Sequence, residues 1–151
     1  MRVSELMSRD VVTLRDTETC HEAIDRMCRR KVRHLPVLDR DGAIVGIVTD
    51  RDVRHRLFAP DTYRQIGKIA VSVLLRQAPV RAVMSAPVRC IGVAADVAEA
   101  AERMRRDKVG CLPVVDGSRL VGMLTEIDVL RSIVAAEVLE SPELDVVISY
   151  P

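Results

Sequence analysis

Aromatic residues are scarce in this 151-residue chain, which has no Trp, one Phe and two Tyr. A protein that binds unpaired bases uses aromatic side chains to stack them, so this scarcity argues against single-stranded nucleic acid as a partner. The net charge is only +1, which gives no overall field to attract nucleic acid or an anionic membrane. We therefore expect a core of Val, Ile, Leu, Met and Ala, with no nucleic-acid and no membrane partner.

Long apolar runs are also lacking. The longest, residues 69–75, is interrupted by Ser72 and is too short to span a bilayer. The first residues carry no apolar segment of the kind found in secretory signals, so we expect a cytoplasmic protein. None of the four cysteines belongs to a CxxC pair or has metal-ligand spacing. We expect reduced thiols and no metal site.

The strongest feature that is present is an internal repeat. Residues 3–8 recur as 80–85, residues 31–37 as 108–114, and residues 45–53 as 121–129. Between residues 7 and 38, roughly 13 of 32 aligned positions are identical to residues 84–115. Because the three motifs recur in the same order, the sequence predicts two copies of one structural unit.

Each copy is predicted to fold in the order β-α-β-β-α. In the first copy, β-rich runs and helical apolar spacing predict a strand at 11–14, a helix at 20–30, strands at 35–38 and 43–48 joined by a turn at Asp41–Gly42, and a helix at 50–57. The second copy is predicted at 88–91, 96–106, 112–115, 119–124 and 126–135. We place the units at 1–58 and 80–135.

The remaining segments are a linker and a tail. In the linker, 59–79, a connecting helix is predicted because five apolar residues share one helical face: Tyr63, Ile66, Ala70, Val73 and Leu74. The tail, 136–151, contains the helix breaker Pro142, and a strand at 146–148 is possible.

This order of elements, with its three repeated motifs, resembles the CBS domain over about residues 3–58 and 80–134. The resemblance implies an α/β fold of the α+β type, in which two repeats pack about a pseudo-two-fold axis into one Bateman module. It also implies clefts that bind adenosine-containing ligands such as AMP, ADP, ATP or S-adenosylmethionine. Members of this family are regulatory rather than catalytic, and their modules usually dimerise.

A Thr-x-x-Asp pattern stands at each junction between an apolar strand and a helix, as Thr49 with Asp52 and Thr125 with Asp128. One explanation is structural, because this is the pattern of a capping box. The resemblance implies a second role, in which Thr contacts phosphate and Asp holds the two ribose hydroxyls. Asp suits that role because an ionised carboxylate only accepts hydrogen bonds.

The other candidate residues follow from the resemblance. Basic residues before the Leu-Pro-Val strand can face phosphates, which implicates Arg33 and His34, although Arg33 can equally be a solvated surface cation. Arg51 joins them, and because Gly110, Cys111 and Ile127 replace these three residues in the second repeat, we expect the clefts to differ in charge. The resemblance adds residues that border adenine or belong to the Leu-Pro-Val motif: Val12, Thr13, Val88, Cys90, Pro36 and Pro113.

Gly46 and Gly122 lie inside predicted strands. A glycine weakens a strand and is expected there only where another group approaches the backbone closely. Close packing of the facing helix and room for a ligand explain them equally well.

We therefore predict a non-enzymatic regulatory module that binds an adenine nucleotide, requires no cofactor and signals to an unknown effector protein. The alternatives are a ligand-free scaffold or dimerisation module, a binder of S-adenosylmethionine or NAD(H), and an enzyme with a Cys/His site. The last is the weakest, since no acid is positioned to orient a pair such as Cys111 and His34. A homodimer is expected because helices must hide apolar faces, such as Val129, Leu130 and Ile133.

Overall fold

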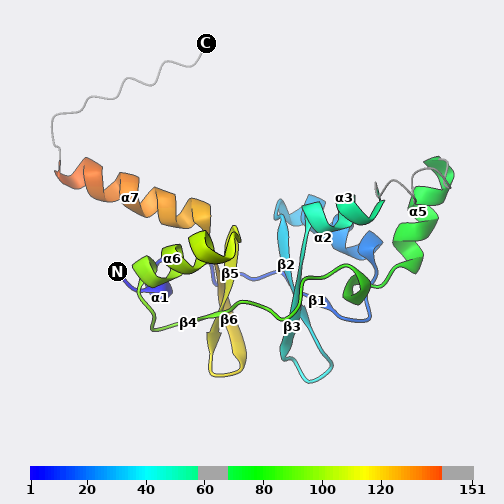
Figure 1. Ribbon diagram of the computed structural model, residues 1–151, viewed down its shortest axis with the longest axis horizontal. Helices are drawn as coiled ribbons and strands as arrows, with labels where there is room; N and C mark the ends of the chain where they lie inside the picture. The colour runs from blue at the N-terminus through cyan, green and yellow to red at the C-terminus, as the bar shows by residue number, and fades with distance from the viewer. Residues whose placement is uncertain (58–67, 141–151) are drawn as a thin grey trace, which may run out of the picture.

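The computed structural model describes residues 1–57 and 68–140, which form two similar units lying side by side (Figure 1). In the first unit, parallel pairing of β1 with β2 and antiparallel pairing of β2 with β3 make a mixed three-stranded sheet. Its elements are β1 (Leu14–Arg15), α2 (Cys20–Arg30), β2 (His34–Leu38), β3 (Ile44–Thr49) and α3 (Asp50–Leu57).

The second unit repeats this topology. Its sheet has the order β4-β5-β6, again with one parallel and one antiparallel pair. Its elements are β4 (Ile91–Gly92), α6 (Val97–Asp107), β5 (Cys111–Asp116), β6 (Arg119–Thr125) and α7 (Glu126–Glu140). The predicted fold, two β-α-β-β-α units, is therefore confirmed.

The helices match their predicted bounds better than the short strands do. The predicted helices at 20–30 and 50–57 are confirmed as α2 and α3. The strands predicted at 11–14 and 88–91 are wrong except for their last residue, because pairing with the neighbouring strand begins only at Leu14 and Ile91. The residues before these two positions run between the units instead of along a sheet (Figure 1).

Part of the linker forms the expected helix, α5 (Lys68–Gln77), which packs against α2. Leu75, which is not on the predicted apolar face, packs against the first core, whereas Val73, which is on that face, is exposed. Tyr63 and Ile66 lie outside the described residues. α7 continues to Glu140, five residues past its predicted end, and the predicted features at Pro142 and 146–148 also lie outside the described residues. No helix in the described chain is long and apolar enough to cross a membrane.

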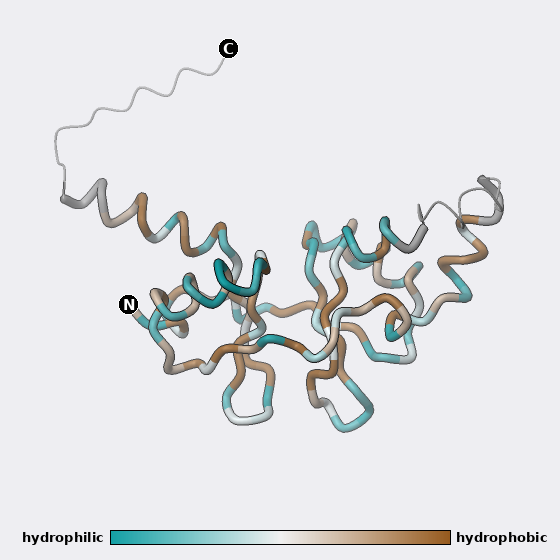
Figure 2. The backbone as a smooth tube through the Cα atoms, in the orientation of Figure 1, coloured by the Kyte–Doolittle hydropathy of each residue, from teal (hydrophilic) through white to brown (hydrophobic). Residues whose placement is uncertain are grey.

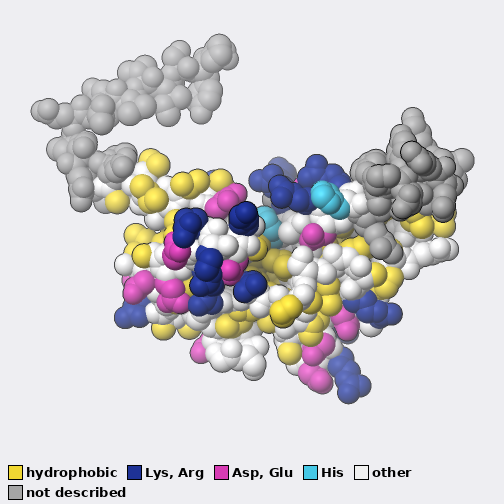
Figure 3. Space-filling view, viewed as in Figure 1, with side chains coloured by type: hydrophobic (Ala, Val, Ile, Leu, Met, Phe, Trp, Pro, Cys, Tyr) yellow, Lys and Arg dark blue, Asp and Glu magenta, His cyan; other side chains and the backbone are white. Residues whose placement is uncertain are grey.

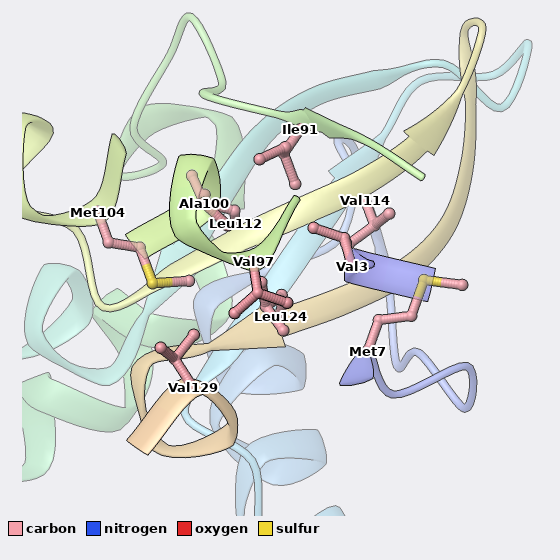
Figure 4. Packing of buried hydrophobic residues seen from close by; sticks show 10 residues of the cluster. All are labelled: Val3, Met7, Ile91, Val97, Ala100, Met104, Leu112, Val114, Leu124 and Val129. Carbon is pink, nitrogen blue, oxygen red and sulfur yellow. The ribbon is translucent and has the colours of Figure 1, made fainter. Parts of the chain in front are cut away.

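The sequence alone did not reveal that the two units exchange their leading segments. The helix α1 (Val3–Leu6) packs into the core of the second unit, with Val3 and Met7 beside Ile91, Val97 and Leu124 (Figure 4). Val80, its counterpart in the 3-10 turn η1 (Val80–Ala82), is buried in the core of the first unit. Each unit therefore completes its core with a segment from the other half of the chain.

The exchange explains the two strand glycines. A Cβ at Gly122 would lie 2.5 Å from Met7 Sδ and 3.0 Å from the carbonyl oxygen of Ser8. At Gly46 a Cβ would overlap Met84. Ser8 also exchanges two backbone hydrogen bonds of 2.9 Å with Met123, which fixes the segment in place. Close packing therefore accounts for both glycines, but the expected partner was wrong: the exchanged leading segments, and not a facing helix, approach them.

Candidate functional site

Thr49 and Asp52 form a complete capping box where β3 turns into α3. The Asp52 carboxylate accepts from the Thr49 backbone N–H at 2.8 Å and from the Thr49 hydroxyl at 2.9 Å, and the Asp52 N–H donates to that hydroxyl at 3.1 Å. Thr125 and Asp128 repeat the arrangement at the start of α7, with distances of 2.9, 2.6 and 3.3 Å. The structural explanation of these residues is therefore correct.

Capping leaves part of each carboxylate available. All the hydrogen bonds to Asp52 and Asp128 within the described chain go to Oδ2, so Oδ1 is free to accept from a ligand hydroxyl. Each Thr hydroxyl, by contrast, already donates its proton to the Asp carboxylate. The geometry thus favours the Asp side chain as the acceptor for the ribose hydroxyls. The Thr hydroxyl keeps an acceptor lone pair but has no proton left to donate to a phosphate.

A cavity of about 590 Å³, here called the first cavity, opens between the two units beside Asp52. Its first-unit wall contains Arg33, His34 and residues 49–52. The second unit supplies the opposite wall, from residues 85 and 87–89, the end of α6 and the start of β5. Of the predicted site residues, this cavity brings together Thr49, Asp52, Arg33, His34, Arg51, Val88 and Pro113.

A smaller cavity of about 240 Å³, the second cavity, lies beside Asp128. Its wall includes residues 10–12, which correspond in the repeat to 87–89, together with the segment 31–34 of the first unit. The predicted residues that it brings together are Thr125, Asp128, Val12, Arg33 and His34. Each cavity therefore pairs a Thr/Asp box with the segment that leads into the first strand of the other unit.

Three predicted site residues line neither of these two cavities. Pro36 is fully buried within β2. The carbonyl oxygens of Thr13 and Cys90 each accept a 2.6 Å hydrogen bond from a helix arginine, Arg26 and Arg103 respectively. These two hydrogen bonds therefore connect the segment that leads into the first strand of each unit to the helix of the same unit.

Five cations surround the first cavity, from both units: Arg33, Arg51, Arg89, Arg105 and Lys108. Arg105 pairs with Glu102 at 2.7 Å, and Arg89 lies 3.6 Å from Asp107. Arg33, Arg51 and Lys108 form no ion pair with any described residue, so they are available to an anion. Figure 3 shows Lys and Arg side chains gathered over α6 and, opposite, over the α2 and α3 end of the first unit.

The sequence interpretation missed the three cations of the second unit. It assigned residues to clefts repeat by repeat, but the first cavity takes its walls from both repeats. Lys108 aligns with Lys31, and that alignment was the only available signal. Lys108 ends α6 in the left-handed conformation, with φ of 53°, beside the cavity wall.

His34 and Cys111 both line the first cavity, but the Cys111 thiol is not activated as a nucleophile. Burial raises the pKa of the Cys111 thiol to about 12, with a further contribution from Glu126, so the thiol stays protonated at neutral pH. Burial also lowers the pKa of His34, as does the neighbouring Arg33, while Asp50, Glu126 and Asp52 oppose the shift. Among residues 1–57 and 68–140, no group of three His, Cys, Asp or Glu side chains is placed to hold a metal ion.

Comparison with known proteins gives a consistent result. The family model described as "CBS domain" matches residues 3–59 and 80–135. A CBS domain-containing protein of Dictyostelium discoideum is 35% identical over 136 residues, covering 85% of this chain and 88% of that protein. Other curated relatives are longer: the chain spans 32% of a Methanocaldococcus jannaschii protein and 21% of a mycobacterial inosine-5'-monophosphate dehydrogenase.

Solved structures share the fold. The crystal structure of a putative acetoin utilization protein from Vibrio cholerae is 32% identical, with a TM-score of 0.71 over 100% of this chain and 98% of that one. The CBS domain pair of protein MJ0100, crystallised with 5'-methylthioadenosine and S-adenosyl-L-methionine, has a TM-score of 0.75 at 23% identity and covers 90% of this chain and 98% of that one.

Proposed function

Because this chain belongs to the CBS-domain family as a tandem pair, we propose that it is a regulatory module whose clefts bind an adenine nucleotide. The observation that carries the proposal is the composition of the first cavity. A carboxylate with a free Oδ1 stands at one point of the wall, and cations from both units stand at other points of it. This combination suits a ribose joined to phosphate.

The same cations favour a nucleotide over S-adenosylmethionine, whose sulfonium group is positive. The solved pair of protein MJ0100 holds adenosyl compounds, so the ligand class is adenosyl in a structure of the same fold. In this chain, Arg33, Arg51 and Lys108 lack ion-pair partners among the described residues and would favour an anionic adenosyl ligand. AMP, ADP and ATP are the members of that class that we propose, with NAD(H) as the next candidate.

A thermal-shift titration tests the proposal. A ligand present at 100 times its dissociation constant stabilises the native state by about 2.7 kcal/mol. We expect AMP, ADP or ATP at millimolar concentration to raise the melting temperature, with a smaller effect for S-adenosylmethionine and for GTP. A flat melting temperature with all the adenosyl ligands would leave only the scaffold function.

Signalling requires a partner, and we propose that the module acts as a homodimer that reports occupancy to an effector protein. Leu130, Ile133 and Val134 of α7 are 56%, 51% and 60% exposed. Figure 2 shows these apolar stretches on a helix that extends away from the body of the molecule. Val129, assigned to the dimer face from the sequence, is instead buried in the second core. A ligand changes the signal only if it binds one arrangement of the units more tightly than another.

A further inference from the structure

The two cavities share part of their walls. Arg33, His34, Gly110 and Glu126 line both of them. The same hydrogen bond recurs within each unit at this wall: the Asp50 N–H donates to the Arg33 carbonyl oxygen at 3.2 Å, and the Glu126 N–H donates to the Gly110 carbonyl oxygen at 3.0 Å. Asp50 and Glu126 begin α3 and α7, so the two helix starts are tied to this shared wall.

The repeat is asymmetric on this wall. Arg33 and His34 belong to the first unit, and their counterparts Gly110 and Cys111 carry no cation. The shared wall therefore offers one guanidinium, one imidazole and one carboxylate to two cavities. A guanidinium that forms a bidentate contact with one phosphate has few donors left for a second phosphate, so two phosphates compete for Arg33.

We propose that the two cavities are negatively coupled through this shared wall, so that a polyphosphate nucleotide in one lowers the affinity of the other for a second polyphosphate nucleotide. Adenosine has no phosphate and escapes the effect. The coupling rests on the proposed function, since it requires that both cavities bind nucleosides. Because coupling is reciprocal, either cavity weakens the other by the same factor.

The experiment compares each cavity alone with both together, by titration calorimetry of ADP and of adenosine. Asp128→Ala leaves the first cavity to be measured alone, and Asp52→Ala leaves the second. Asp52→Asn and Asp128→Asn serve as second variants, because an amide oxygen can still accept the capping hydrogen bonds. The wild-type titration then gives the affinity of the weaker cavity when the stronger one is filled.

For ADP we expect that affinity to be about tenfold lower than the affinity of the same cavity measured alone, within the usual range of coupling factors. For adenosine the two values should agree. In an Arg33→Ala background the ratio between these two ADP affinities should fall towards one. Arg51→Ala is the matched control. Arg51 also forms no ion pair in the described chain, but of the two cavities it lines only the first. The ratio between the two ADP affinities should therefore persist in this variant.

Four outcomes would overturn the proposal. Equal ADP affinities alone and together would mean that the cavities are independent. An equal factor for adenosine and ADP, or a factor that survives in the Arg33→Ala background, would mean that phosphate competition for the shared cation is not the cause. If neither ligand binds the wild-type protein at all, the proposed function fails and the coupling fails with it, and this result differs from two independent sites.

Discussion

Asp52 is the residue whose two roles are hardest to separate, because it caps α3 and also faces the first cavity. Loss of ligand binding in an Asp52 variant has two possible causes, a lost contact or a damaged helix. The chain contains its own control: Thr19 and Glu22 form the same box at the start of α2, and neither lines either cavity.

We predict that Asp52→Ala and Glu22→Ala each lower the free energy of unfolding by about 1 kcal/mol, as expected for a lost cap. Only Asp52→Ala should also weaken nucleotide and adenosine binding at the first cavity, by about 1.5–3 kcal/mol, because every such ligand carries a ribose. Denaturant unfolding and calorimetry measure the two effects. If Glu22→Ala weakened binding as much, the effect of Asp52 would be one of stability alone.

His34 gives the site a pH dependence. Burial and Arg33 lower its pKa below the usual value of 6.5, against the opposing effects of Asp50, Glu126 and Asp52. A bound phosphate favours the imidazolium, so affinity for a polyphosphate should fall as pH rises through the pKa. The decline in affinity therefore begins below pH 6.5, whereas an imidazole with the usual pKa would place its start at about pH 6.5.

We predict that ATP binds wild-type protein more tightly at about pH 5.5 than at about pH 7.5, relative to a His34→Asn variant. The variant is needed because the terminal phosphate titrates near the same pH, with a pKa of about 6. Adenosine affinity should not change with pH in either protein. Identical ATP profiles for wild type and variant would remove His34 from the phosphate site.

Among the elements, the exchanged leading segments are the least replaceable. Each runs beside a strand of the other unit and occupies the space that a side chain would need at Gly122 or Gly46. At Gly122 the obstacle includes the backbone carbonyl of Ser8, which is itself held by Met123 and cannot move aside.

We predict that Gly122→Ala costs about 1–3 kcal/mol of stability, as overpacking does. Gly92→Ala is the control, because nothing lies within 4 Å of a Cβ built there, and it should be nearly neutral. Thermal or urea unfolding of both variants measures the difference. Equal stabilities would show that the segment 1–8 does not pack tightly against β6.

Sequence patterns predicted an element correctly where its bounds depend only on its own residues. The apolar spacing of α2 lies within that helix's own residues, and the bounds predicted from it are confirmed. The entrances to β1 and β4 depend on where pairing with β2 and β5 begins, which is a tertiary property. The residues of the candidate site fall into the same two groups, those set by local sequence and those set by tertiary structure. Local motifs identified the Thr/Asp boxes, whereas Lys108 reaches the first cavity only because the units face each other.

The exposed apolar residues of α7 form the proposed dimer interface of the molecule. Patches of this kind on soluble proteins mark interaction sites. We predict that Leu130→Glu converts a homodimer to a monomer in light scattering, because it places a charge in the proposed interface. Val73→Glu is the control: Val73 is 46% exposed on α5, a different helix, so the dimer should persist. A wild-type protein of monomer mass at all concentrations would contradict the dimer.

The central claim is that the Thr/Asp boxes beside the two cavities bind the ribose of an adenine nucleotide. Its most direct test is a calorimetric titration of AMP into the wild-type protein and into the Asp52→Asn/Asp128→Asn double variant, which retains an acceptor for each cap. We expect measurable binding to the wild-type protein and at least about tenfold weaker binding to a still-folded double variant. Undiminished AMP binding by the double variant, or none by the wild-type protein, would contradict it.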